Sequence, residues 1–243
     1  MKDGERIEDL QLRNLRIIQQ VNAFRYGMDA VILADFANIK TNMRVCDLGA
    51  GSGILSFLLT GRAEGVLIDA VEIDGEAADR MSRSVQLNGL EDSISVYTGD
   101  MREAFRFLQS KYDMVICNPP YHEECHALFM KPQECDARSE TGCSYSDVAF
   151  AASRVLRNRG RFLTMCPARR MFDMTYALQN QNIHIKRQRF VRSFAEREPY
   201  LCLLEGMLQG KPGVKIEPSL TIYEKQGVHT PELLKMYHNG ETI

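Results

Sequence analysis

MRVCDLGAGSGILSFLL, residues 43–59, is the stretch of the sequence that decides the fold. Its apolar start predicts a buried strand at 43–47, and the apolar run from Ile54 predicts the beginning of a helix. The turn between them carries glycines at alternate positions, which allow the backbone to approach a ligand closely at a helix amino terminus. The stretch therefore predicts a strand, a ligand-binding turn and a helix.

The spacing of the glycines argues against two familiar nucleotide-binding loops. Gly49, Gly51 and Gly53 form the pattern Gly-x-Gly-x-Gly, whereas dinucleotide-binding enzymes carry Gly-x-Gly-x-x-Gly. No Gly-Lys-Ser/Thr follows, which argues against a P-loop. Taken alone, the loop is also compatible with a glycine-rich turn that only packs a helix on a strand.

Two further predicted strands end next to carboxylates. The run 65–71 precedes Glu72, which lies about 20 residues after the loop, where doubly wound folds place a ribose-binding acid. We therefore expect Glu72 to bind both ribose hydroxyls and Asp74 to cap the next helix. The run 93–97 leads to Asp100, which could accept from an adenine amino group or cap a helix.

A fourth apolar run, 112–117, stops at NPPY, residues 118–121. Two consecutive prolines donate no backbone hydrogen bonds and hold the chain extended. The side chain of Asn118, the carbonyl of Pro119 and the ring of Tyr121 should then gather at a strand end. The two acceptors suit the N–H groups of a planar amine, and the ring can stack on its face. The alternative is a plain strand-to-loop stop with a solvated tyrosine.

This ordered series of strand ends resembles the S-adenosylmethionine-dependent methyltransferases, amino-methylating branch, over roughly residues 20–210. The resemblance implies S-adenosylmethionine as cofactor, with Asp47 and the glycine backbone at its methionine part, Glu72 at its ribose and Asp100 at its adenine. It implies that Asn118, Pro119 and Tyr121 hold the target amine. The residues implied for cofactor binding are Asp47, Gly49, Gly51, Gly53, Glu72, Asp100 and Asn118.

The segment in front of the first strand narrows the resemblance. QQVNAFRYGMDAVILA, residues 19–34, is similar to the lead-in of the bacterial tRNA1(Val) adenine-N6 methyltransferases, which modify the adenosine 3′ of the anticodon. ARSE, residues 137–140, resembles a short Arg/Glu motif of that group but lacks its usual histidine. Asp29 predicts a helix N-cap for the apolar run that follows it. Phe24 and Tyr26 fit ordinary packing under the cofactor site equally well.

Positive charge is concentrated in one part of a chain whose formal net charge is −2. Between Arg154 and Arg192, ten lysines and arginines stand against a single acid, Asp173. Such a basic stripe is typical of phosphate binding, and Tyr176, Phe190 and Phe194 could stack on unpaired bases. We therefore expect tRNA as the partner. The alternative is a solvated basic face, because several arginines flank predicted helix ends. The stripe consists of Arg154, Arg157, Arg159, Arg161, Arg169, Arg170, Lys186, Arg187, Arg189 and Arg192.

Several zinc-type ligands follow the NPPY motif, but their spacing does not favour a metal site. His122, Cys125, His126, Cys135 and Cys143 contain no Cys-x-x-Cys pair. We interpret 123–142 as a polar lid beside the target pocket and expect no metal.

The rest of the chain predicts a single domain of one fold class. With 243 residues, 44% of them hydrophobic, the chain can form a doubly wound α/β domain whose mostly parallel, seven-stranded sheet is Rossmann-like. Predicted strands at 183–193 and 200–208 should form an antiparallel hairpin, because their link is short. The expected parts are a helical lead-in (1–40), a catalytic core (41–210) and a C-terminal extension (211–243). Further helices are predicted at 76–88, 101–110, 145–157, 169–180 and 231–237, and a strand at 161–166.

The composition also indicates where the protein acts. The first residues are polar and acidic, so we expect no signal peptide. No run approaches the ~20 apolar residues of a membrane helix. Seven irregularly spaced cysteines are typical of reduced thiols in a cytoplasmic protein.

Together these features predict N6-methylation of an adenosine in tRNA, the one 3′ of the anticodon in tRNA1(Val). The motif indicates that the target is an amine but not which molecule carries it. A guanine in ribosomal RNA and a glutamine amide in a release factor therefore remain alternative substrates. DNA is less favoured, since no target-recognition domain accompanies the core. A non-catalytic cofactor-binding or RNA-binding module would need a broken amine clamp, whereas Asn118, Pro119 and Tyr121 are all present.

Overall fold

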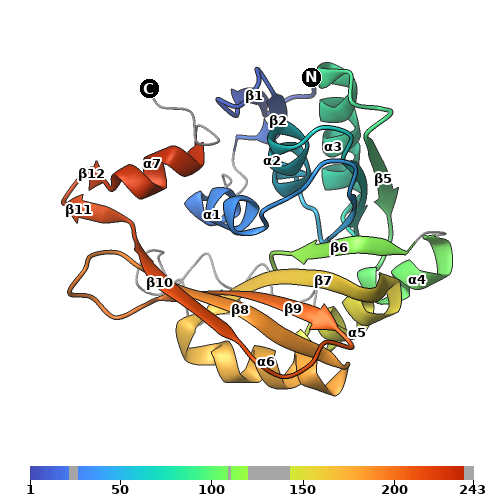
Figure 1. The fold of residues 1–243 in the computed structure, drawn as a ribbon. Helices are drawn as coiled ribbons and strands as arrows, with labels where there is room; N and C mark the ends of the chain where they lie inside the picture. The colour runs from blue at the N-terminus through green and yellow to red at the C-terminus, as the bar shows by residue number, and fades with distance from the viewer. Residues whose placement is uncertain (22–26, 109–110, 120–142, 238–243) are drawn as a thin grey trace.

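The computed structural model describes residues 1–21, 27–108, 111–119 and 143–237. Within them, eight strands form one sheet in the order β10-β8-β9-β7-β6-β3-β4-β5 (Figure 1). The strands are β3 (Arg44–Leu48), β4 (Leu67–Glu72), β5 (Ile94–Thr98), β6 (Tyr112–Cys117), β7 (Leu156–Pro167), β8 (Ile183–Arg192), β9 (Leu201–Leu208) and β10 (Lys215–Thr221).

The sheet is mostly parallel, as predicted. Strands β5, β4, β3, β6 and β7 pair in parallel, whereas β9 runs antiparallel to both β7 and β8. This confirms the doubly wound α/β class and the antiparallel hairpin near the C-terminus. The predicted number of seven strands was wrong, because β10 adds an eighth, parallel to β8. Leu220 of β10 and Ile222 just after it are buried in the core, so the edge strand gains apolar burial as well as backbone pairing.

Helices cover both faces of the sheet, and each face has its own core (Figure 1). Strand β6 shows why its sequence is a continuous apolar run: Met114 and Ile116 enter one core, Val115 and Cys117 the other. Helices α1 (Met28–Phe36), α2 (Ile54–Arg62) and α3 (Gly75–Asn88) pack in the first core, and α4 (Ala104–Phe107), α5 (Tyr145–Val155) and α6 (Met171–Asn180) in the second.

Shorter elements complete the architecture. Two 3-10 turns, η1 (Met101–Glu103) and η5 (Ala168–Arg170), precede α4 and α6. Near the C-terminus, β11 (Tyr223–Lys225) and β12 (Val228–His229) form a small antiparallel pair, and α7 (Pro231–Tyr237) follows. Helix α7 buries Leu233 and Met236 in the core that contains α1.

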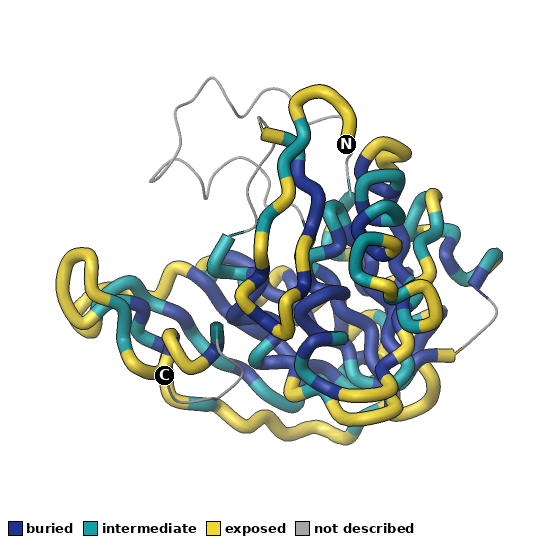
Figure 2. The backbone as a smooth tube through the Cα atoms, turned by 90° about the horizontal axis from the view of Figure 1, so that it is seen from above, coloured by how far each residue is buried: buried dark blue, intermediate teal, exposed yellow. Residues whose placement is uncertain are grey.

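The N-terminal segment differs from the helical lead-in predicted for residues 1–40. Strands β1 (Glu5–Asp9) and β2 (Arg16–Gln20) form an antiparallel hairpin, and α1 is the helix of this segment among the described residues. β-branched Ile17 and Ile18 favour a strand, and both are buried. Figure 2 shows the hairpin rising from the body of the molecule with the N-terminus at its tip.

Side chains of α3 fasten this hairpin. Arg83 makes a two-pronged ion pair with Glu5, with Nη1 and Nη2 at 2.8 and 2.5 Å from the carboxylate oxygens. This hydrogen-bonded guanidinium lowers the pKa of Glu5 to about 2. Ser84 Oγ accepts from the backbone N–H of Ile18 at 2.9 Å. The side chain of Asn88 accepts from the N–H of Arg16 and donates to its carbonyl.

Two predicted helix boundaries were wrong. Asp29 is not the N-cap of α1, because the helix begins earlier, at Met28, with Gly27 as the cap. The Asp29 carboxylate stands in the first turn, where the helix dipole favours it. Helix α5 ends at Val155 rather than 157, because Leu156 already pairs with Tyr112 in the sheet. Residues 158–160, between the predicted helix and the predicted strand, lie at a bulge in β7, in which Arg159 has φ 59°.

Candidate active site

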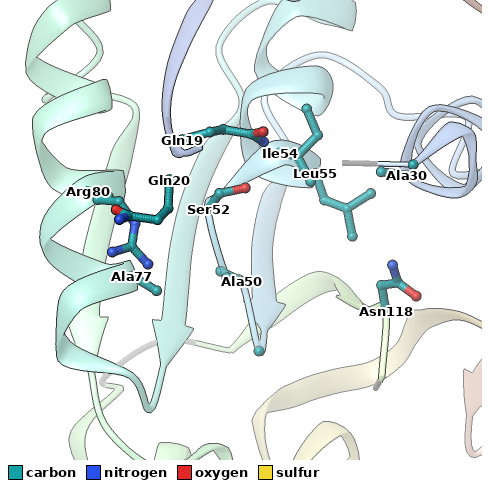
Figure 3. Close-up of a pocket in the computed structure, with 13 residues that line it drawn as sticks. Gln19, Gln20, Ala30, Ala50, Ser52, Ile54, Leu55, Ala77, Arg80 and Asn118 are labelled. Atoms are coloured by element: carbon teal, nitrogen blue, oxygen red, sulfur yellow. The ribbon is translucent and has the colours of Figure 1, made fainter. Parts of the chain in front are cut away.

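A cavity of about 280 Å³ opens at the carboxyl edge of the sheet (Figure 3). Its described walls come from the end of β2, the start of α1, the glycine loop with the start of α2, the first half of α3 and the residue after β6. The lining residues are Gln19, Gln20, Gly27, Ala30, Gly49, Ala50, Gly51, Ser52, Ile54, Leu55, Ala77, Arg80 and Asn118.

The glycine loop has the strand–turn–helix form that its sequence predicts. Gly49, Gly51 and Gly53 have φ values of 73°, 58° and 82°, a region that costs other residues free energy. A Cβ on Gly53 would also lie 2.7 Å from the side chain of Met81. The backbone N–H groups of Gly49 and Ala50 both donate to the Val71 carbonyl, so β4 fixes the shape of the turn.

Substitution of Gly51 with alanine should separate backbone strain from loss of ligand space. The added methyl meets nothing within 4 Å, so it would occupy open space where the loop lines the cavity. We expect affinity for S-adenosylhomocysteine to fall about ten-fold, or about 1.4 kcal/mol, in isothermal titration calorimetry.

The matched control is Gly89→Ala at the end of α3. Gly89 has a similar φ of 63° and equally open surroundings, but it does not line the cavity. Both variants should lose about 1 kcal/mol of folding free energy from left-handed backbone strain. If both also lost ligand affinity equally, the loop would not be a ligand site.

Asp47 lies beneath the loop rather than among the described residues of the cavity wall. The carboxylate is fully buried, with Oδ2 accepting from Ser56 Oγ at 2.7 Å, and Oδ1 has no hydrogen-bond partner among the described residues. Burial raises the pKa of Asp47 to about 7; the Ser56 hydrogen bond opposes the rise and the charge of Glu72 adds to it. The folded protein therefore keeps, under the loop, a carboxyl group whose charged form is destabilised by burial.

Glu72 joins the loop to the end of β4. One carboxylate oxygen accepts from the Gly51 N–H at 2.7 Å and the other from the Asp74 N–H at 2.9 Å. Asp74 in turn accepts from the Glu76 N–H and caps α3, which confirms that prediction. Glu72 thus stands at the strand end where we expected it, and its contact with ribose stays a prediction.

Asp100 caps η1 through a hydrogen bond from the Arg102 N–H at 2.9 Å. The Arg102 guanidinium also pairs with both carboxylate oxygens, and this hydrogen bonding lowers the pKa of Asp100. The capping role is therefore present, while binding of adenine by Asp100 stays a prediction.

Asn118 stands at the end of β6 and lines the cavity opposite α3 (Figure 3). Its strand neighbour Cys117 pairs with Thr164 of β7, and Pro119 is buried immediately after it. The structure thus brings Asn118 and the glycine loop to one cavity, as the order of strand ends predicted. Tyr121 lies outside the described residues.

Other residues singled out in the sequence also lie outside the described part of the chain. They are Phe24, Tyr26, the whole 123–142 segment with its 137–140 motif, and His122, Cys125, His126 and Cys135. Cys143 is described: its Sγ lies 3.7 Å from Met101 Sδ, and burial raises the pKa of this thiol to about 11. Within the described ranges, no three metal-ligating side chains gather.

The basic stripe divides into an internal and an exposed part. Arg161 and Arg187 both pair with Glu205, which is 6% exposed. They also donate to the carbonyls of Ala37 and Phe36 at the end of α1. Arg189 pairs with Glu232. These three arginines stabilise the fold, and the exposed members of the stripe are Arg154, Arg157, Arg159 and Arg169.

The aromatic residues divide in the same way. Phe190 packs in the second core, and Phe194 lies against Tyr223 with ring centroids 5.5 Å apart. Tyr176 of α6 is 68% exposed, and Phe172, one turn earlier, is 77% exposed. Sequence reasoning missed Phe172, although two aromatics four residues apart beside Arg169 on a predicted helix were a usable signal.

Comparisons with known proteins agree with this geometry. The family model "Methyltransferase small domain" matches residues 24–134. The tRNA1(Val) (adenine(37)-N6)-methyltransferase of Citrobacter koseri is 30% identical over 186 residues, covering 75% of this chain and 74% of the relative. The enzyme of the same name from Escherichia coli O157:H7 is 29% identical over the same shares.

Solved structures show the same fold at lower identity. A predicted O-methyltransferase from Agrobacterium tumefaciens superposes with a TM-score of 0.70 at 17% identity, covering 88% of this chain and 97% of that one. TrmN from Thermus thermophilus superposes with a TM-score of 0.53 at 20% identity, covering 74% of this chain and 48% of that one.

Within the described ranges, each helix is too short or too polar to cross a bilayer. Three observations lead to one family. They are the glycine loop after β3, Asn118 at the end of the neighbouring strand β6, and the sequence match over three quarters of the chain. The chain belongs to the S-adenosylmethionine-dependent methyltransferases that carry the methyltransferase small domain, and it is related to the tRNA adenine-N6 enzymes among them.

Proposed function

We propose that this protein transfers a methyl group from S-adenosylmethionine to N6 of an adenosine in tRNA, the one 3′ of the anticodon in tRNA1(Val). The observation that carries the proposal is Asn118 followed by Pro119 at the end of β6, on the same cavity as the glycine loop. The names of the relatives at 29–30% identity support the choice of tRNA and adenine. A tRNA substrate would place the activity in the cytoplasm.

The residues around the cavity fit the cofactor. Gly51 leaves open space, and Gln19 and Asp47 carry buried polar atoms without hydrogen-bond partners. We place the methionine part of the cofactor at the glycine loop, with Asp47 beneath it, the ribose at Glu72 and the adenine at Asp100. When bound, the cofactor supplies an electrophilic methyl group on a sulfonium.

The protein's part in the reaction is to hold and orient the amine. An exocyclic adenine nitrogen is a poor nucleophile because its lone pair is delocalised into the ring. The side-chain oxygen of Asn118 and the carbonyl of Pro119 would each accept one N–H, and Tyr121 would stack on the base. This favours a more pyramidal nitrogen with its lone pair directed at the methyl group, so catalysis rests on positioning and electrostatics. No strong base is required, because the proton can leave during or after the transfer.

Helix α6 is the RNA surface that we propose. Strand β7 is the direct neighbour of β6, and η5 and α6 follow its carboxyl end at once. Arg169, Phe172 and Tyr176 are spaced as one face of this segment, and all three side chains are exposed. A cation beside exposed rings suits an unpaired loop, whose bases leave their stack more cheaply than paired ones.

Removing both rings, with Phe172→Ala and Tyr176→Ala together, should weaken tRNA binding. Stacking on an aromatic side chain is worth about 1–3 kcal/mol per base, so we expect the KM for tRNA to rise about ten-fold or more. Affinity for S-adenosylhomocysteine should stay unchanged. The control is Leu67→Ala, which truncates a side chain that is 41% exposed. Leu67 is the first residue of β4 and therefore lies at the amino ends of the parallel strands, away from the carboxyl edge where the cavity opens. An equal rise in KM for the control would contradict the assignment of α6.

The same proposal treats residues 1–243 as one methyltransferase domain. One sheet runs from β5 to β10, so the tail beyond residue 211 contributes a strand to the core rather than a separate unit.

The proposed function is tested by methyl transfer from labelled S-adenosylmethionine to total tRNA from cells that lack this protein. After digestion to nucleosides, label in N6-methyladenosine is the expected result. If the protein binds the cofactor but transfers no label to tRNA, the proposal is wrong. Ribosomal RNA, with a guanine amine, and release factors, with a glutamine amide, would then be tested.

A further inference from the structure

We infer that Gln19 of the N-terminal hairpin binds the amino-acid end of the cofactor. This inference rests on the proposed function and assigns a binding residue that lies outside the glycine loop. Gln19 is 4% exposed, and neither its side-chain oxygen nor its side-chain nitrogen has a hydrogen-bond partner among the described residues. The same side chain lines the cavity, and Figure 3 shows its amide reaching from β2 toward Ser52 and Ile54.

A buried side-chain amide without hydrogen-bond partners is unusual unless a bound ligand supplies those partners. Buried polar atoms are nearly always hydrogen-bonded, because an unmade bond leaves the group desolvated without compensation. Leucine or methionine would fill the same space on β2 at no such cost. Among the described residues of the cavity wall, Gln19 is the side chain with both a buried donor and a buried acceptor left unpaired.

The chemistry of the amide selects the amino-acid end. Its N–H2 group donates and its oxygen accepts, which complements a carboxylate beside an ammonium. A cation lines the same cavity: the side chain of Arg80 is largely buried there, with the carboxylates of Asp74 and Glu76 at 4.0 and 3.8 Å. A neutral amide can serve both charges of a zwitterion without carrying a buried charge of its own.

The positions of the strand ends select the same end of the molecule. Glu72 ends β4, Asp100 comes just after β5, and Asn118 follows β6 on the other side of β3. A cofactor whose nucleoside lies at Glu72 and Asp100 has its amino-acid end left for the glycine loop after β3. Gln19 reaches the cavity at this loop.

Two ligands separate this role from a general effect on the cavity. S-adenosylhomocysteine carries the amino-acid end, whereas 5′-methylthioadenosine has the same nucleoside and lacks it. We measure the affinity of each by isothermal titration calorimetry for the full-length wild-type protein, Gln19→Met and Gln19→Glu. Gln19→Met should weaken S-adenosylhomocysteine about ten-fold or more and leave methylthioadenosine within two-fold. Gln19→Glu should weaken S-adenosylhomocysteine further, because it places a carboxylate against the ligand's carboxylate.

Thermal unfolding without ligand excludes a merely structural role. Since the side chain of Gln19 makes no hydrogen bond with the described residues, Gln19→Met should keep or raise the midpoint. Ile7→Ala is the control on the same hairpin, because it truncates a side chain that is 42% exposed on β1. It should leave both affinities unchanged.

Each other outcome overturns the inference in a recognisable way. Equal loss of both ligands in Gln19→Met, or a lowered midpoint, would assign Gln19 to the structure of the hairpin. Unchanged affinity for S-adenosylhomocysteine would remove Gln19 from the site while leaving the proposed function intact. If the wild-type protein bound neither ligand, the cofactor assignment itself would fall.

Discussion

Asn118→Ala is expected to lower the turnover of methyl transfer on the order of a hundred- to a thousand-fold, the range seen when one preorganised hydrogen-bonding group is removed from an active site. The dissociation constant for S-adenosylhomocysteine should change only a few-fold. Among the described residues of the cavity wall, Asn118 is the one that follows β6. The glycine loop, α2 and α3 form the part of the wall at which we propose that the cofactor binds. The lost interaction is therefore one that matters most when the amine attacks.

Single-turnover rates with saturating cofactor and tRNA measure this effect, and two further variants serve as comparisons. Asn118→Asp retains an acceptor oxygen and should keep a larger share of the rate than alanine does. Gln86→Ala removes an exposed side-chain amide in the second half of α3, outside the described cavity wall, and should keep the full rate. If turnover of Asn118→Ala survived nearly intact, the amine-clamp role of this strand end would be wrong.

Asp47→Asn is expected to change how folding stability depends on pH. In the folded protein the pKa of Asp47 is about 7 rather than 3.8. Between these values the folded state holds a proton that the unfolded state has released, so the free energy of unfolding falls as pH rises. Each pH unit costs about 1.4 kcal/mol, and the interval covers roughly three units, so the total is on the order of 4 kcal/mol. The loss is complete a little above pH 7.

Urea unfolding of both proteins at pH 4, 6 and 8 measures the difference. At pH 4 the two stabilities should be similar, and at pH 8 the asparagine variant should be the more stable. The difference between the proteins isolates Asp47, because every other titrating group is present in both. Parallel curves across this range would show that the carboxyl titrates normally. A carboxylate retained at such a cost under a ligand-binding loop indicates a functional requirement.

Sequence reasoning located the parts of the site that depend on local pattern. Strands buried on both faces give continuous apolar runs, so β3 and β6 were visible directly, with their ends fixed by Gly49 and by Asn118-Pro119. In a parallel sheet the carboxyl ends meet at one edge. The order of strand ends therefore predicted that Asn118 and the glycine loop share a cavity.

The parts that escaped prediction depend on distant partners. The charge pattern could not show that Arg161 is held by Glu205, 44 residues away, and so the basic stripe looked more uniform than it is. Strand β1 is short and polar, and it is held by Arg83 of α3, 78 residues along the chain. Gln19 resembles a surface residue in the sequence, and only the packing of the hairpin buries it.

The attachment of the hairpin to α3 has a kinetic consequence. β1 and β2 form their own two-stranded sheet, so they can open without breaking the central sheet, at a free energy below that of global unfolding. Helix α3 holds the hairpin with its second half through Arg83 and lines the cavity with its first half through Arg80. A ligand held between Gln19 and Arg80 would have to lose one wall whenever the hairpin opened. Its residence time and the hydrogen exchange of the Ile18 amide, which is bonded to Ser84, would then share one opening step.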